Sequence, residues 1–158
     1  MPINTWMNDW NDIIRKIIFP DEQLRELMLL PKGTTIINFI DKYFIRSGYT
    51  NELLEHEDVR IVYGTISPED TQVANVKKQE MSFDIYVRRE LLHNATDDRL
   101  QYRTQLIANR LIQLLTKNGK DGRYIGGYRF WVKNEQDLGT RTSGYVRYNV
   151  SFNFMRVY

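Results

Sequence analysis

The N-terminal part of the chain carries apolar residues at helical spacing. A first amphipathic helix, ended by Pro20, is predicted from Trp6, Trp10, Ile13, Ile14, Ile17 and Ile18. A second helix is predicted over Asp21–Leu30, with acidic residues in its first turn, where negative charge suits the helix dipole. The segment Thr35–Ile45 is ambiguous, because its spacing is helical but its β-branched start is typical of a strand. We favour a helix there.

Further along, the pattern changes to an alternation of apolar and polar residues. Strands are predicted over Val59–Thr65, Lys77–Arg89, Tyr124–Lys133 and Gly144–Val157. The alternation is strictest in the second strand, where one face carries Met81, Phe83, Ile85 and Val87. Such alternation is typical of a sheet with one buried face. The polar stretches Ser67–Val76 and Asn134–Ser143 are predicted to be loops, the second as a long hairpin tip.

The strongest helix pattern lies between the second and third strands. Asn94 is its candidate N-cap, and Asp97 and Asp98 fall in its first turn. Its apolar stripe comprises Leu100, Ile107, Leu111, Leu114 and Leu115, and the pattern stops at Asn118-Gly119.

These elements predict an α+β fold: a four-stranded, mostly antiparallel sheet, a long helix packed on one face, and additional N-terminal helices. The 158 residues suit a single domain, with a helical part over 1–55 and a sheet-plus-helix core over 59–158. No run of about twenty apolar residues is present, so no membrane span is predicted.

Composition narrows the possible chemistry. The chain has no cysteine, which excludes disulfides, thiolate metal sites and cysteine nucleophiles. The two histidines, His56 and His93, lie in different predicted elements without a metal-ligand spacing. Gly126-Gly127 lies inside a predicted strand and does not resemble a phosphate loop.

A metal-dependent nuclease would place acids on one strand face, and Glu80 and Asp84 do share a face of the second strand. Four residues of extended chain separate them by roughly 13 Å, too far for both to bind one magnesium ion directly. An alternating polar sheet face explains them better. We therefore expect no catalytic, cofactor-binding or metal-binding residues, no cofactor and no enzymatic activity.

Charge is distributed unevenly along the chain. Residues 1–60 carry ten acids and seven bases, whereas residues 117–158 carry three acids and eight bases. The C-terminal part also contains nine aromatic residues, and basic sheets with exposed aromatics can bind nucleic acid. Tyr, Trp, Phe and Arg are equally enriched at protein interfaces, so a complementary protein surface stays open as the alternative.

The chain resembles phage tail terminator proteins and minor head–tail joining proteins. The resemblance is carried by the strand Phe83-Asp84-Ile85-Tyr86-Val87, followed by Asp97-Asp98-Arg99-Leu100 and Ile107-Ala108-Asn109-Arg110-Leu111-Ile112. The resemblance covers about residues 59–158 and rests on loose apolar patterns. It implies a structural virion protein at the head–tail junction, made in the bacterial cytoplasm, which forms a ring that caps the tail tube and joins it to the head.

The implied partners are further copies in a ring, expected to be a hexamer, the tail tube protein, neck proteins, and double-stranded DNA that passes through the lumen without being read. No membrane partner is expected. Because connections between strands often carry contacts, the candidate interface residues are Pro68, Glu69, Asp70, Thr71, Gln72, Asn134, Glu135, Gln136, Asp137 and Arg141. Another neck component, such as a connector or stopper, and a small DNA-binding or DNA-processing protein stay open as alternatives.

Overall fold

The computed structural model describes residues 5–48, 58–70, 77–93, 102–116, 128–142 and 144–156. The helical segments are α1 (Thr5–Ile13), the π-helix η1 (Ile14–Ile18), α2 (Glu22–Leu27), α3 (Ile36–Asn38), the π-helix η2 (Phe39–Tyr43), the short 3-10 helix η3 (Arg89–Leu91) and α4 (Arg103–Thr116). The strands are β1 (Phe44–Arg46), β2 (Val59–Asp70), β3 (Lys77–Arg88), β4 (Tyr128–Thr142) and β5 (Tyr145–Arg156). The fold is therefore α+β, as predicted.

The described strands form one five-stranded sheet in the order β1-β2-β3-β5-β4. The four longer strands pair antiparallel, whereas β1 pairs parallel to β2 over three residues. The prediction of four strands is thus corrected to five and the sheet is mixed. The added strand is short, and its sequence continues the helical apolar spacing of Thr35–Ile45, so only its pairing with Ile61–Tyr63 distinguishes it.

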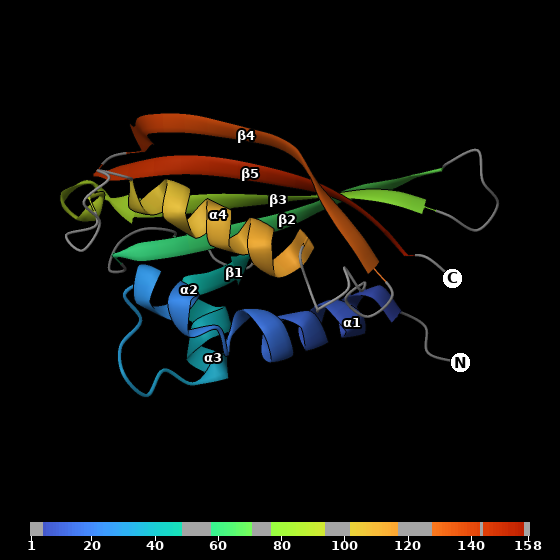
Figure 1. Cartoon of the computed structure of the whole chain (residues 1–158), viewed down its shortest axis with the longest axis horizontal. Coiled ribbons are helices and arrows are strands. Elements are labelled where there is room, and N and C mark those ends of the chain that lie inside the picture. The colour runs from blue at the N-terminus through green and yellow to red at the C-terminus, as the bar shows by residue number, and fades with distance from the viewer. Residues whose placement is uncertain are drawn as a thin grey trace.

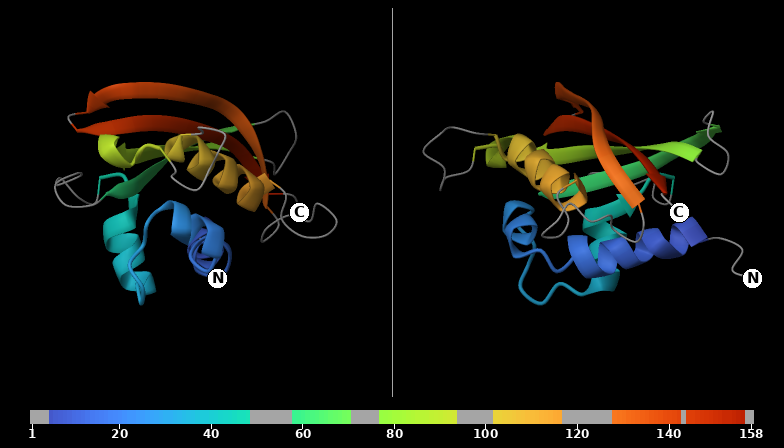
Figure 2. Two further views of the ribbon diagram at one scale, coloured as in Figure 1. Left: turned by 60° about the vertical axis from the view of Figure 1, so that its left-hand side comes forward. Right: turned by 45° about the vertical axis from the view of Figure 1, so that its right-hand side comes forward.

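All of the longer helices lie on the same side of the sheet (Figure 1). Helix α4 contacts β3, β4 and β5, and the N-terminal helices lie beside it, with α2 and η1 touching α4. Figure 2 shows the sheet curving over α4. The predicted packing of a long helix on one face is confirmed, and the opposite face of the sheet, which we call the outer face, is turned away from these helices.

An aromatic cluster joins the N-terminal helices to the sheet. Trp10 of α1 is 1% exposed, and its ring lies 5.5 Å from that of Tyr63, 6.2 Å from Phe83 and 6.4 Å from Phe44. Phe83 in turn meets Phe152 of β5 edge to face at 5.6 Å. The apolar face predicted for β3 lines this core, together with Val150, Phe152 and Phe154 of β5.

The N-terminal segments fold largely as their spacing predicts. Asp21 is the N-cap of α2, where its carboxylate accepts a hydrogen bond of 2.9 Å from the backbone N–H of Leu24. The ambiguous segment Thr35–Ile45 is helical through Tyr43 and becomes a strand at Phe44. The extended part therefore lies at the end of this segment and not at its β-branched start.

Two predicted loops are wrong in part, because strand pairing extends into them. Residues 67–70 belong to β2, with a register shift between Ile66 and Glu69, while residues 71–76 lie outside the described residues. Asn134–Thr142 continues β4 along β5, and Ser143 again lies outside. A strand at the edge of a sheet can be exposed to water, so it does not need a run of apolar residues. Its polar sequence therefore resembles that of a loop, even though its backbone pairs with the neighbouring strand.

Helix α4 begins later than predicted. Tyr102 forms an antiparallel bridge with His93, and the helix starts at Arg103. The predicted N-cap Asn94 and the acids Asp97 and Asp98 lie outside the described residues. At the observed start, the buried guanidinium of Arg103 donates to the carbonyls of Leu91 at 2.9 Å and Leu27 at 3.0 Å, which ties α4 to the end of α2.

Within the described parts of the chain, none of the helices is both long and apolar enough to cross a bilayer.

Candidate functional site

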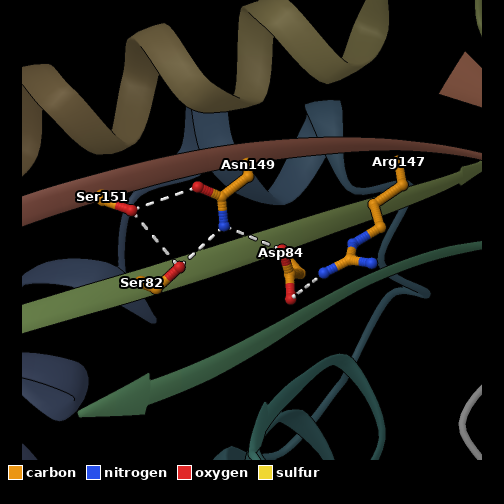
Figure 3. Close-up of polar contacts among 5 residues, drawn as sticks. All are labelled: Ser82, Asp84, Arg147, Asn149 and Ser151. Carbon is orange, nitrogen blue, oxygen red and sulfur yellow. Dashed lines mark hydrogen bonds and ion pairs between the residues drawn. The ribbon is translucent and has the colours of Figure 1, made fainter. Parts of the chain in front are cut away.

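The outer face of the sheet carries a cluster of polar side chains on the neighbouring strands β3 and β5. Figure 3 shows this polar network, which consists of Ser82, Asp84, Arg147, Asn149 and Ser151. The alternation of each strand turns its bulky apolar residues inward to α4 and leaves these polar ones outward. The antiparallel register then sets Ser82 opposite Ser151 and Asp84 opposite Asn149.

Each member of the polar network bonds another. The amide Nδ2 of Asn149 donates to Ser82 Oγ at 2.7 Å and to Asp84 Oδ1 at 2.9 Å. The second carboxylate oxygen, Asp84 Oδ2, accepts from Arg147 Nη2 at 2.9 Å. Ser151 Oγ lies 3.1 Å from Asn149 Oδ1 and 3.4 Å from Ser82 Oγ. These hydrogen bonds link β3 to β5 side by side, while Arg147 Nε is buried without a hydrogen-bond partner among the described residues. The network therefore holds the two strands in a fixed register.

The surroundings of Arg147 are mixed. Burial acts against its charge, but the hydrogen bond and the negative charge of Asp84 hold the pKa of Arg147 above its ordinary value. Its guanidinium also lies 5.7 Å from the ring centre of Tyr86, a cation–π arrangement. Burial raises the pKa of Tyr86, so the phenol stays neutral at physiological pH. The network therefore presents a neutral aromatic beside a fixed cation.

The two carboxylates of β3 that suggested a nuclease have separate partners. Asp84 belongs to the polar network, whereas Glu80 pairs with Lys133 Nζ of β4 at 2.7 Å. Among the residues that the structure describes, no group of three or more His, Asp or Glu side chains could hold a metal ion. The ion pairs give both acids a role in linking strands.

In the part of the chain that the structure describes, β4 and β2 form two edges of the sheet that are unpaired along at least part of their length. Among the described strands, β4 pairs only with β5. Strand β1 pairs with β2 only from Ile61 to Tyr63, so beyond Gly64 no described strand lies on the side of β2 away from β3. Unpaired N–H and C=O groups along an edge are a template for pairing with another chain. These edges, together with the outer face, make up the candidate interaction surface.

The structure does not bring the predicted interface residues together. Pro68, Glu69 and Asp70 lie in β2, and Thr71 and Gln72 lie outside the described residues. Asn134–Asp137 and position 141 lie in β4, on the opposite edge of the sheet, with β3 and β5 between. The exposed side chains of Asn134, Glu135, Gln136 and Asp137 remain available to a partner on that edge.

Sequence reasoning missed the polar network, although it placed one of its members, Asp84, on the polar face of the second strand. The alternation does not predict that β3 pairs with β5. It shows which side chains of one strand share a face, whereas the neighbouring strand is determined by the tertiary structure.

Comparison with protein families adds one finding. The model of the family described as YomW matches residues 7–154, which is most of the chain. No curated protein matches the chain.

Proposed function

The chain belongs to the YomW family, and we propose that it is a structural protein at the head–tail junction of a tailed phage, where copies form a ring that caps the tail tube and joins it to the head. The family name is phage-associated. The resemblance of residues 59–158 to tail terminator and minor head–tail joining proteins supplies the more specific assignment.

The observation that carries the proposal is that the described strands form a sheet with two different edges, neither of which is fully paired within the described residues. Helices cover its inner face. On the side away from β5, β4 has no described strand beside it, and on the side away from β3, β2 has none beyond Gly64. A subunit with two different pairing surfaces associates head to tail, and such contacts close into a ring when the rotation between copies allows it. The observed α+β architecture is compatible with that role.

Deletion of the gene from the phage that carries it, followed by electron microscopy of the lysate, tests the proposal. We expect tails of uncontrolled length beside filled heads that have no tail. Tails of normal length beside unattached heads would assign the protein to another neck component, such as a connector or stopper. Normal infectious particles would overturn a place at the junction altogether.

A further inference from the structure

The outer face of the sheet differs from the rest of the described surface in what it exposes. Large apolar side chains that are exposed mark surfaces that proteins bury against one another. Of the side chains that the structure describes, those of this kind all lie away from the outer face, on or next to the helices or in the inner-face row of Phe152: Leu29, Ile37, Ile40, Tyr102 and Val132. The described part of the outer face therefore suits contact with water or with a polar partner.

Two cations of the outer face form ion pairs between strands. Arg147 Nη2 of β5 lies 2.9 Å from Asp84 Oδ2 of β3 (Figure 3). Lys133 Nζ of β4 lies 2.7 Å from Glu80 Oε2 of β3, so this pair spans β5, which lies between the two strands. The side chain of Arg147 is 33% exposed and that of Lys133 is 48% exposed. Each would be accessible to a phosphate group if its acid were absent.

A third cation, Arg88, lies on the same face of β3, two residues beyond Tyr86. Its Nε lies 3.0 Å from Oδ1 of Asp58, an ion pair without the geometry of a hydrogen bond. The guanidinium of Arg88 lies 5.5 Å from the ring centre of Tyr145, just as that of Arg147 lies 5.7 Å from Tyr86. Acids and aromatic rings thus hold both guanidinium groups along the sheet. Together, the three ion pairs contribute no net charge.

The strands of this face also lie where the chain is most basic. Residues 117–158, which include β4 and β5, contain eight bases and three acids. An excess of positive charge attracts a polyanion from a distance. Tight binding, in contrast, requires cations that neutralise phosphates and release their counterions. A cation that must first leave its acid gains little from a phosphate, so this face can lie beside DNA without holding it.

We propose that the outer face is the surface past which double-stranded DNA moves in the assembled ring, and that Asp58, Glu80 and Asp84 keep its cations from binding phosphate. This proposal rests on the proposed function and names the surface that faces the duplex. Between the ion pairs, the serine and asparagine side chains of the polar network are neutral and bond one another. They add no charge that would slow the passage of DNA.

Removal of the acids tests the electrostatic part of the proposal. The variant carries Asp58→Asn, Glu80→Gln and Asp84→Asn, which free three cations and keep the shape of each side chain. We expect this variant to bind a short DNA duplex at least tenfold more tightly than the wild type at low salt, measured by fluorescence anisotropy. The logarithm of its affinity should fall with the logarithm of salt concentration with a slope of about −3, because each neutralised phosphate contributes about −0.9.

A matched variant carries the same change of net charge on the helical side of the molecule. Glu22→Gln, Glu26→Gln and Asp41→Asn alter exposed acids of α2 and η2 and should leave duplex binding at the wild-type level. Equal gains in the two triple variants would show that net charge alone governs binding. No gain in either would show that the acids of the outer face do not mask its cations. Each of these results would overturn the proposal.

A double variant keeps the test valid if the triple variant does not fold. Asp58→Asn with Glu80→Gln frees Arg88 and Lys133 and leaves the polar network intact. Its circular dichroism should equal that of the wild type, and its gain in duplex binding should be smaller than that of the triple variant but in the same direction. A folded double variant that binds no better than Glu22→Gln with Glu26→Gln would contradict the masking of these two cations.

Cross-linking in phage particles tests the location of the DNA. Because the chain has no cysteine, a single cysteine can carry a photoactivatable azide. Gln136→Cys lies on the outer face beside Asn149, whereas Asn109→Cys lies on α4, and both positions are exposed. On irradiation of filled particles, Gln136→Cys should link to DNA at least tenfold more than Asn109→Cys. Equal yields, or a higher yield from Asn109→Cys, would show that the duplex does not pass the outer face.

The two proposals fail separately. Normal infectious particles after deletion of the gene would overturn the place at the head–tail junction, whatever the purified variants bind. Tails of uncontrolled length after deletion, together with DNA that cross-links through Asn109→Cys and not through Gln136→Cys, would overturn only the assignment of the outer face.

Discussion

Arg110 of α4 holds Asp21, the N-cap residue of α2, through both oxygens of its carboxylate. Arg110 Nε donates to Asp21 Oδ2 at 2.9 Å, and Arg110 Nη2 pairs with Oδ1. The same Oδ2 accepts from Leu24 N–H. One acidic side chain, only 12% exposed, thus caps the start of helix α2 and ties it to α4, the helix packed on the sheet.

The double role of Asp21 predicts unequal effects of removing the two partners. Asp21→Ala removes an N-cap, which should lower the free energy of unfolding by about 1 kcal/mol. It also leaves the partly buried Arg110 without its carboxylate partner, which should lower the free energy of unfolding by roughly another 1–3 kcal/mol. Arg110→Met keeps the cap and should cost less. Urea denaturation of both variants measures the difference, and an equal loss would contradict the capping role.

The same pair predicts a dependence of stability on pH. The hydrogen bond from Arg110 lowers the pKa of Asp21, burial opposes it, and the Leu24 N–H lowers it further. The folded pKa therefore lies below the unfolded value of about 3.9. The stabilisation is complete above that unfolded value and is lost as the pH falls through the folded pKa.

Urea midpoints at pH 7 and pH 3 measure this effect. The midpoint of the wild type should fall more between these pH values than the midpoint of Asp21→Asn, which cannot titrate at this position. Equal falls in the two proteins would show that other carboxylates carry the acid sensitivity.

The carboxylates of β3 provide a matched pair for the polar network. Asp84→Ala leaves Arg147 and Asn149 without their acceptor on a partly buried face and should cost about 2–3 kcal/mol. Glu80→Ala removes an ion pair to Lys133, whose side chain is 48% exposed, and should cost less than about 1 kcal/mol. If thermal denaturation gave the two variants the same stability, the network would have no special role.

Trp10 predicts how strongly the N-terminal helices depend on the sheet. Trp10→Ala removes the indole ring by which α1 packs against Tyr63 and Phe83 and leaves a cavity there. It should lower the free energy of unfolding by about 3–5 kcal/mol. Trp10→Phe keeps most of the ring volume and should cost clearly less. Guanidinium denaturation followed by circular dichroism compares the two variants, and similar losses would place the contribution of Trp10 outside this aromatic cluster.

Binding to DNA separates the proposed role from the alternative of a DNA-binding protein. A protein whose function is to bind phosphates loses affinity steeply as salt rises. We expect no appreciable binding of duplex or single-stranded DNA by the purified protein even at low salt, measured by fluorescence anisotropy. Tight binding with a steep salt slope would favour the DNA-binding alternative and direct attention to the basic residues of β4 and β5.

Local periodicity in the sequence was sufficient to predict the α+β class, the core face of β3 and β5, and the helical N-terminal part. The apolar face of Met81, Phe83, Ile85 and Val87 is buried, and Asp21 stands at the start of its helix, because both features depend on neighbours within a few residues. The positions of the polar network could also be assigned to a strand face.

Tertiary structure alone decided which strands are neighbours and where pairing stops. The strand Phe44–Arg46 exists because Ile61–Tyr63 pairs with it, and Asn134–Thr142 is extended because β5 continues beside it. The Asp84–Arg147 pair likewise depends on strand order. Backbone hydrogen bonds across a sheet join residues far apart in the chain, so no local pattern of apolar and polar residues determines them.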